Sequence, residues 1–368
     1  DLSDSVETLS IGACAFSNCS GLKEIKFPAK IKQIGNEAFR NCSALTAVTI
    51  PSMTSTFGKH VFADCSNLST LVYNGAKTLP EGAFANCVNL SSVTIGNTVT
   101  SIGKETFVNC GEITSIVLPE NLTSIGASSF ANCAKLTTVA FTSAKMPSID
   151  GTSFAGCVNL TTLAANGATF ENSALYTEDE GGNLTLALYI GNAETFTVKD
   201  GTDIIGANAF KGNANIKTID LKAVTTINNS AFEDCTALET VTAPKMNFIG
   251  EKAFKNCGKL NGVELTQVRT LKSYAFSGCT SLTSVQLVEI EEANLGSNVF
   301  EGCSSLATAT VARMRYIGRY MFKNCTALES FSFDGVTYIA TGAFSGSLNL
   351  ASITNFDSVE TLGYAAFE

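Results

Sequence analysis

One short sequence unit recurs along almost the whole chain of 368 residues. It reads Ile-Gly-x-x-Ala-Phe-x-Asn-Cys-x-x-Leu-x-x-Val-x-Ile-Pro, and residues 34–51 form a complete copy. A fixed period of this length predicts a solenoid, in which each repeat forms one coil. The phenylalanine returns every 22 to 24 residues, with one interval of 56, at Phe16, Phe39, Phe62, Phe84, Phe107, Phe130, Phe154, Phe210, Phe232, Phe254, Phe276, Phe300, Phe322, Phe344 and Phe367.

The repeat also bears on domain organisation. A globular chain of this length usually divides into two or more domains, because a single core stops growing. A coil buries its apolar residues only against its two neighbours, so coils can be added without a central core. We therefore expect one continuous α/β repeat solenoid in three stretches: a first array over 1–163, an irregular segment over 164–205 and a second array over 206–368.

Half of each unit alternates between apolar and polar residues. Val48 and Ile50 alternate with Ala47 and Thr49, which is the period of a β-strand. Stacked coils would pair these strands into a parallel sheet that forms the concave wall. Its outward positions in the first array are mostly serine and threonine, namely Thr49, Ser92, Thr94, Ser115, Thr138 and Thr162.

The Gly-x-x-Ala-Phe half of the unit does not alternate, and Asn, Asp or Gly follows two residues after the phenylalanine. These residues tolerate the positive φ with which a helical turn stops. We therefore expect a short helix or 3-10 turn on the convex side, with the phenylalanine rings stacked in a buried ladder. The residue two before the phenylalanine varies, as in Glu37, His60 and Gly82, which suggests solvent exposure.

Twelve of the thirteen cysteines share one position, three residues after the phenylalanine. No Cys-x-x-Cys pair supplies converging metal ligands, so a column of buried, free thiols is expected instead. Cys14 lies outside this column; as an exposed thiol it could be reactive and join two molecules, or it could pair with Cys19. The column comprises Cys19, Cys42, Cys65, Cys87, Cys110, Cys133, Cys157, Cys235, Cys257, Cys279, Cys303 and Cys325.

The composition argues against several classes of function. His60 is the only histidine, so catalytic triads and histidine metal sites lack their central residue. We expect no catalytic residues, no metal and no cofactor, and therefore no enzyme. A net charge of −9 argues against nucleic-acid binding, and no apolar run is long enough for membrane insertion.

The repeat is interrupted between Phe154 and Phe210. Within this interval, two alternating apolar runs, 174–177 and 184–190, flank an acidic, glycine-containing segment. This pattern predicts an irregular β-hairpin inserted into the solenoid. Such an insertion either has a function of its own or only joins the two arrays of coils.

Charged and aromatic residues interrupt the uniform surface at a few places. Four charged residues are expected at outward strand positions, and residues 313–320 hold three of the five arginines. Arginine and tyrosine are common anchors in interfaces. Alternatively, Arg269, the 289–292 loop and Arg315 pair with one another along the edge of the solenoid. The candidate partner-binding residues are Lys26, Asp220, Lys222, Glu264, Arg313, Arg315, Tyr316 and Tyr320.

The repeated pattern resembles the BspA-like leucine-rich repeat, and the resemblance covers almost the whole chain. It implies a curved, right-handed leucine-rich-repeat solenoid. By analogy it also implies an extracellular or cell-surface protein that adheres to host molecules or to other cells. No export signal is visible at Asp1 and the chain stops on a fresh coil at Phe367, so we expect a fragment or mature segment.

Two functions follow as hypotheses. The first is a non-enzymatic, monomeric, adhesin-like module that binds a protein or glycan on host or neighbouring cells. The alternative is a structural spacer or surface-layer solenoid without a specific ligand. A binder should carry a localised patch of aromatic and charged residues, whereas a spacer should be uniform; the sequence is uniform before Phe154 and more varied after Phe210.

Overall fold

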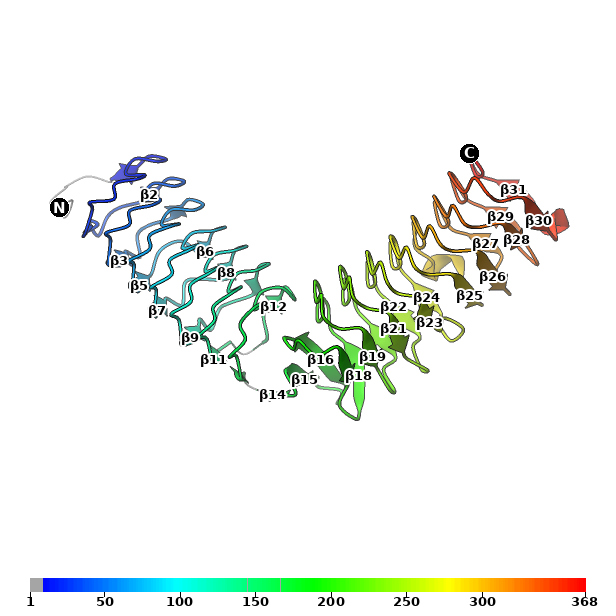
Figure 1. The fold of residues 1–368 in the computed structure, drawn as a ribbon, viewed down its shortest axis with the longest axis horizontal. Helices are drawn as coiled ribbons and strands as arrows, with labels where there is room; N and C mark the ends of the chain where they lie inside the picture. The colour runs from blue at the N-terminus through cyan, green and yellow to red at the C-terminus, as the bar shows by residue number, and fades with distance from the viewer. Residues whose placement is uncertain (1–8, 144, 166) are drawn as a thin grey trace. The chain divides into compact units, whose positions relative to one another are not determined.

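The computed structural model describes residues 9–143, 145–165 and 167–368 (Figure 1). The chain forms two compact units, 1–175 and 176–368. Each unit is a stack of coils with parallel strands, which confirms the predicted solenoid. The three-stretch division, the handedness and the concave face expected from the sequence stay predictions.

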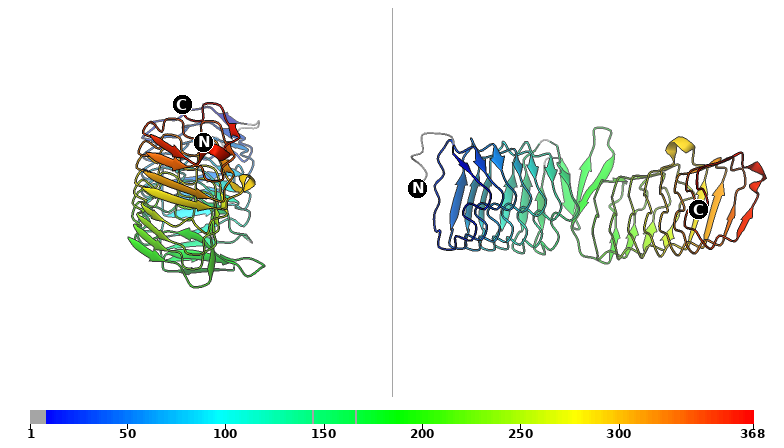
Figure 2. Two further views of the ribbon diagram at one scale, coloured as in Figure 1. Left: turned by 90° about the vertical axis from the view of Figure 1, so that its right-hand side faces the viewer. Right: turned by 90° about the horizontal axis from the view of Figure 1, so that it is seen from above.

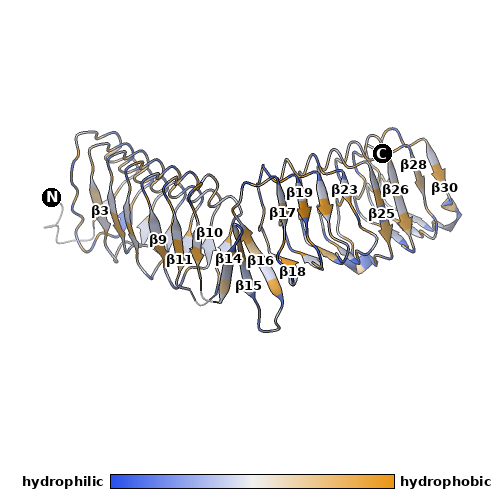
Figure 3. Ribbon diagram, turned by 60° about the horizontal axis from the view of Figure 1, so that its bottom comes forward, coloured by the Kyte–Doolittle hydropathy of each residue, from blue (hydrophilic) through white to orange (hydrophobic). Residues whose placement is uncertain are grey.

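The strand predicted in each repeat forms one wall, called here the long-strand wall. Its alternation is confirmed: in β3, Val48 and Ile50 are buried while Ala47 and Thr49 are exposed. The inward residues give the strands of both units their apolar bands (Figure 3). In the first unit the strands are β3 (Ala47–Ile50), β5 (Thr70–Tyr73), β7 (Ser92–Ile95), β9 (Ser115–Leu118), β11 (Thr138–Phe141) and β13 (Thr162–Ala164). In the second they are β17 (Thr195–Thr197), β19 (Thr218–Asp220), β21 (Thr240–Thr242), β23 (Gly262–Val263), β25 (Ser284–Val288), β26 (Thr308–Ala312), β28 (Ser330–Ser332) and β30 (Ser352–Thr354).

The residues just before the glycine of each repeat form a second wall of two-residue strands, called here the short-strand wall. Within each of its sheets, a strand pairs in parallel with the same positions one repeat later, as Gln33 pairs with Thr56. In the first unit these strands are β1 (Ser10–Ile11), β2 (Gln33–Ile34), β4 (Thr56–Phe57), β6 (Thr78–Leu79), β8 (Ser101–Ile102), β10 (Ser124–Ile125) and β12 (Ser148–Ile149). In the second they are β20 (Thr226–Ile227), β22 (Phe248–Ile249), β24 (Thr270–Leu271), β27 (Tyr316–Ile317), β29 (Tyr338–Ile339) and β31 (Thr361–Leu362).

The Gly-x-x-Ala-Phe segments form a third wall made of turns. Of the short helix or 3-10 turn predicted there, the helix is not formed, and the chain makes single turns closed by hydrogen bonds between residues three apart. Two residues per coil have a left-handed backbone, as at Glu37 (φ 56°) and Asn41 (φ 57°), and a helix of L-residues does not accommodate them. The amide of Phe39 donates to the carbonyl of Val61 in the next coil (2.9 Å), while the amide of Arg40 donates to Glu37 within the turn (3.1 Å). Alternate amides therefore join neighbouring coils.

The expected solvent exposure of the residue two before the phenylalanine is only partly found. This residue adopts positive φ at Glu37, His60 and Gly82; Glu37 and His60 are half-buried there, and Gly82 is buried. Among the described residues the helices are η1 (Glu292–Asn294) and η2 (Phe356–Ser358), and neither lies in a Gly-x-x-Ala-Phe segment. No helix in the described part of the chain has the length and apolar character needed to cross a membrane.

The predicted phenylalanine ladder is confirmed within each unit. Phe107 is fully buried, and its ring stacks on Phe84 and Phe130 with centroids 5.6 and 5.3 Å away. In the second unit, Phe254 stacks in the same way between Phe232 (5.1 Å) and Phe276 (5.0 Å). The ladder is continuous because stacking places every repeat position beside its own counterpart one coil away.

The cysteine column is buried from Cys42 onward, and each thiol also has a hydrogen-bonding role. Cys110 Sγ donates to the carbonyl oxygen of Phe84, in the preceding coil, at 3.3 Å. Ser347 substitutes for cysteine and its Oγ donates to the carbonyl of Phe322 at 2.7 Å. The prediction was wrong for Cys19, which is exposed because no described coil covers it on the amino-terminal side.

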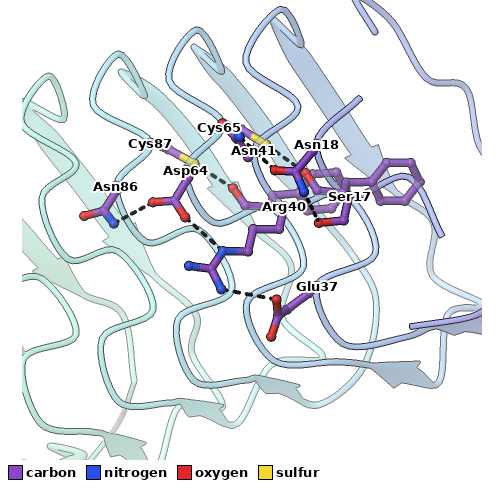
Figure 4. A network of polar contacts seen from close by, with 11 residues as sticks. Ser17, Asn18, Glu37, Arg40, Asn41, Asp64, Cys65, Asn86 and Cys87 are labelled. Carbon is purple, nitrogen blue, oxygen red and sulfur yellow. Dashed lines mark hydrogen bonds and ion pairs between the residues drawn. The ribbon is translucent and has the colours of Figure 1, made fainter. Parts of the chain in front are cut away.

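The residue two after the phenylalanine adds a ladder of amides on the turn wall. Each Nδ2 donates to the side chain one coil earlier: Asn41 to Asn18 (2.9 Å), Asn86 to Asp64 (2.8 Å), Asn109 to Asn86 (2.7 Å) and Asn132 to Asn109 (2.9 Å). A carboxylate cannot donate, so Asp64 breaks the series. It accepts instead from Arg40 Nε at 3.0 Å (Figure 4).

Replacing Asn109 tests what this ladder contributes. Asn109→Ala is expected to lower the free energy of unfolding by about 1–2 kcal/mol, because it removes two hydrogen bonds and places alanine at positive φ. Asn109→Gly loses the same bonds but accepts the backbone, so its loss should be smaller. Urea unfolding followed by circular dichroism measures both. An alanine variant as stable as the wild type would contradict the assigned role.

The irregular segment contains a coil with tyrosine in place of the marker phenylalanine. The ring of Tyr189 is buried and stacks on Phe210 with centroids 4.9 Å apart. The Tyr189 amide donates to Ala209 as the phenylalanine amides do in other coils. In the following coil, Asn213 occupies the cysteine position three residues after Phe210, and its Nδ2 donates to the carbonyl of Gly191 at 3.0 Å.

The segment in which the hairpin is predicted contains two longer strands, followed by β18 (Thr202–Ile205). β15 (Ala174–Glu178) and β16 (Leu184–Tyr189) are neighbours in a sheet, and β16 pairs in parallel with β18. Between them, Asp179 Oδ1 accepts from the amides of Gly181 and Asn183, both at 2.9 Å. Hydrogen bonds to Asp179, most of all from the Asn183 side chain, lower the pKa of this carboxyl group. β14 (Ala168–Glu171) precedes this segment.

Candidate functional site

Three successive coils of the second unit enclose a groove of about 680 Å³, called here the Glu–Arg–Tyr groove. It lies where the chain passes from the long-strand wall to the short-strand wall. The repeat is two residues longer than the 22-residue step at this point, and η1 projects from the flank of the coils there (Figure 2). The lining residues are Glu289, Ile290, Glu291, Glu292, Arg313, Arg315, Tyr316, Thr337 and Tyr338.

The register of the strands sets the order of the groove's charged residues. Val288 of β25 pairs with Ala312 of β26, so the next residues, Glu289 and Arg313, are neighbours on adjacent coils. Both have a left-handed backbone, with φ of 59° and 55°, which turns the chain at the end of each strand. This turn carries the following residues out of the sheet and into the wall of the groove.

Glu289 is held between two arginines. Its Oε2 lies 3.8 Å from Arg269 Nη2 and 3.9 Å from Arg313 Nη1. Arg269 is fixed in turn, because its Nη1 donates to three backbone carbonyls, including that of Val288 at 3.2 Å. The pairing along the edge considered from the sequence is thus formed at Glu289. It involves Arg313 rather than Arg315.

Three charged side chains of the groove take no part in ion pairs among the described residues. Within the described residues, Glu291, Glu292 and Arg315 have no ion pair within 4.0 Å. Exposed ion pairs at the distances found around Glu289 contribute little to stability. The side chains of Glu291, Glu292 and Arg315 are all exposed to solvent.

Two tyrosines form the aromatic surface of the groove. Tyr316 of β27 pairs in register with Tyr338 of β29, and their rings stack with centroids 5.3 Å apart. Tyr338 is 40% exposed, an unusual value for an aromatic residue in this chain. Burial, with the nearby charge of Glu292 as a second cause, raises the pKa of Tyr316.

The structure brings together only part of the predicted set. Arg313, Arg315 and Tyr316 line the groove, whereas Tyr320 does not. Tyr320 is the left-handed residue two before Phe322 on the turn wall, and its ring lies beside Lys323 Nζ, 5.4 Å from the ring centroid.

The other charged candidates are scattered. Lys26 pairs with Glu24 at 3.1 Å, and Lys222 Nζ pairs with Asp200 at 2.6 Å. Asp220 ends β19 and accepts from the amide of Lys222, so it caps a turn. The expectation that these residues occupy strands is wrong for Lys26, Lys222 and Glu264, which lie outside the strands of the long-strand wall.

Cys14 is exposed and adopts a left-handed backbone with φ of 56°. It and Cys19 are separate, free thiols. Its reactivity stays a prediction. Within the described residues, no group of three or more His, Cys, Asp or Glu side chains is arranged to hold a metal ion.

Sequence reasoning left Thr337 and Tyr338 out of the candidate set. The available signal was the repeat itself, because Tyr316 and Tyr338 are 22 residues apart and one repeat step places them side by side. Within a single coil, neither tyrosine indicates that the other lies beside it. Comparing equivalent positions across coils would have found it.

Known proteins share this fold. The profile of the BspA type leucine rich repeat region, in six copies, matches residues 1–110, 77–179, 187–267 and 247–368. A leucine-rich repeat protein from Eubacterium ventriosum ATCC 27560 is 25% identical with a TM-score of 0.56, over 86% of this chain and 80% of that one. One from Bacteroides ovatus ATCC 8483 is 24% identical with a TM-score of 0.43, over 88% and 86%. A leucine rich cell surface protein from Faecalibacterium prausnitzii A2-165 is 21% identical with a TM-score of 0.40, over 96% and 86%.

No curated protein matches the chain. The matched ranges of the family profile include every residue outside 180–186. They contain the repeated phenylalanine, the cysteine column and the strand alternation described above. The chain therefore belongs to the BspA-type leucine-rich repeat family.

Proposed function

We propose that this chain is a non-enzymatic, adhesin-like recognition module at a cell surface, and that the Glu–Arg–Tyr groove is its binding site. Membership of the BspA-type family supports the surface setting. The observation that carries the binding role is the groove itself. There, stacked tyrosines lie beside charged residues that lack ion-pair partners among the described residues.

The rest of the surface supports this choice. A recognition site usually gathers arginine and tyrosine in one recessed place, where partner groups lose water on binding. In the first unit, the outward residues of the long-strand wall are instead uncharged and small or β-branched, as in Thr49, Ser115 and Val117. Binding energy is therefore expected to concentrate at the groove.

A binding screen with matched variants tests the proposal. The purified chain is screened against extracellular-matrix proteins, mucins and glycans, and each hit is measured again with Arg315→Ala and Tyr338→Ala. Both variants are expected to weaken the affinity by about tenfold or more, because a central anchor typically contributes about 2 kcal/mol or more and a tenfold change needs about 1.4 kcal/mol.

The chain offers a control of the same residue type for each variant. Arg40→Ala and Tyr364→Ala remove an arginine of the first unit and an exposed tyrosine, neither of which lines the groove. These controls should retain affinity within about twofold. Hits that respond equally to all four substitutions, or to none, would exclude the groove as the binding site.

A spacer is the second candidate function, and the absence of charged outward residues on the described long-strand wall of the first unit favours it. In that case the length of the solenoid is its function. A spacer should give no saturable hit in the screen, and its groove variants should behave like the wild type.

A further inference from the structure

We propose that the Glu–Arg–Tyr groove binds a short, uncharged oligosaccharide. This inference rests on the proposed function and names the chemistry of its ligand. A groove of about 680 Å³ falls within the range of small-ligand sites, roughly 300–1,000 Å³. It is thus suited to a few sugar rings rather than to a folded protein surface.

The aromatic residues provide a surface for the apolar face of a sugar. Tyr316 and Tyr338 stack on each other through the β27–β29 register, with their rings 19° from parallel, so each ring covers the face that its neighbour turns toward it. A sugar would therefore pack on the exposed part of Tyr338, which is 40% exposed. One face of a pyranose ring presents mainly C–H groups, which pack favourably against the negative face of an aromatic ring. Tyrosine hydroxyls remain available at the rim as hydrogen-bond donors and acceptors.

The charges in the groove oppose a strongly charged ligand of either sign. Among the described residues, a polyanion would meet the unpaired carboxylates of Glu291 and Glu292, and a polycation would meet the unpaired guanidinium of Arg315. Like charges at short distance inside the groove disfavour such ligands. An uncharged ligand meets neither penalty.

Hydroxyl groups satisfy both kinds of side chain at once. Ionised carboxylates only accept hydrogen bonds, and guanidinium groups only donate them. A hydroxyl does both, so neighbouring hydroxyls on one sugar can donate to Glu291 or Glu292 and accept from Arg315. These are the three charged side chains that the fold leaves without an ion pair within 4.0 Å among the described residues.

Isothermal titration calorimetry with defined glycans tests this inference. The probes are neutral oligosaccharides, their sulfated or sialylated counterparts, and an oligolysine peptide. At least one neutral oligosaccharide is expected to bind, and its affinity should change less than about threefold when salt rises from about 0.05 to about 0.5 M, because charge attraction is not its main source. Tyr338→Ala and Glu292→Gln should each weaken this affinity by about fivefold or more, while Tyr364→Ala should leave it unchanged.

The outcomes separate this inference from the proposed function. Preference for the sulfated or sialylated glycans, or for oligolysine, with strong salt dependence, would overturn the uncharged ligand. If a protein partner survives complete deglycosylation and its binding still depends on Arg315 and Tyr338, the groove functions in recognition but the sugar inference is wrong. Sugar binding that is insensitive to all groove substitutions would overturn both.

Discussion

In the native protein, a thiol reagent is expected to label Cys14 and Cys19 and to leave the other eleven of the thirteen cysteines unreacted. The eleven are buried, and burial raises the pKa of Cys65, Cys110 and Cys325 to about 12. A thiol with such a pKa is ionised in only about one molecule in 10⁴ at pH 8, and only the thiolate reacts. Titration with an aromatic disulfide reagent at pH 8 should count about two thiols before urea and thirteen after it.

Two variants control this count. Cys14→Ser should reduce the native count by one without changing stability, because its side chain is exposed. Cys110→Ser should leave the native count unchanged, and a serine hydroxyl can donate to Phe84 as Ser347 does to Phe322. More than two fast-reacting thiols in the wild type would show that the column opens under native conditions.

Replacing Phe254 by alanine is expected to lower the free energy of unfolding by about 3–5 kcal/mol. The ring is fully buried and stacks on both sides, with interplanar angles of 1° and 9°. Its removal therefore weakens two coil interfaces at once, and in a solenoid those interfaces carry most of the stability. Urea unfolding followed by circular dichroism measures the loss, since the chain has no tryptophan for fluorescence.

Phe254→Leu separates the loss of volume from the loss of stacking. Leucine keeps most of the apolar area, so its loss should be about half that of alanine or less. Hydrogen exchange should increase in the coils that contain Phe232 and Phe276 but not around Phe62, because coils couple mainly to nearest neighbours. An alanine variant that loses less than about 1 kcal/mol would contradict the ladder's role.

Much of the fold could be predicted because the chain repeats. Once coils stack, each residue lies beside its own equivalent, so a recurring phenylalanine becomes a ladder and a recurring cysteine becomes a column. The alternation around Val48 and Ile50 likewise determines which side chains point inward. Tyr189 was not predicted as a member of the ladder because the repeat is defined by phenylalanine, whereas the stack requires only an aromatic ring.

The coil period, the inward residues and the membership of the columns could be predicted from the sequence, because they depend only on spacing and polarity. Tertiary structure decided the turn wall: the amide of Phe39 bonds to Val61 in another coil, which favours turns over the helix that local residues suggested. It also decided the groove. Left-handed backbone at Glu289 and Arg313, together with the register of Tyr316 and Tyr338, assembles side chains from three coils, and no single repeat contains that arrangement.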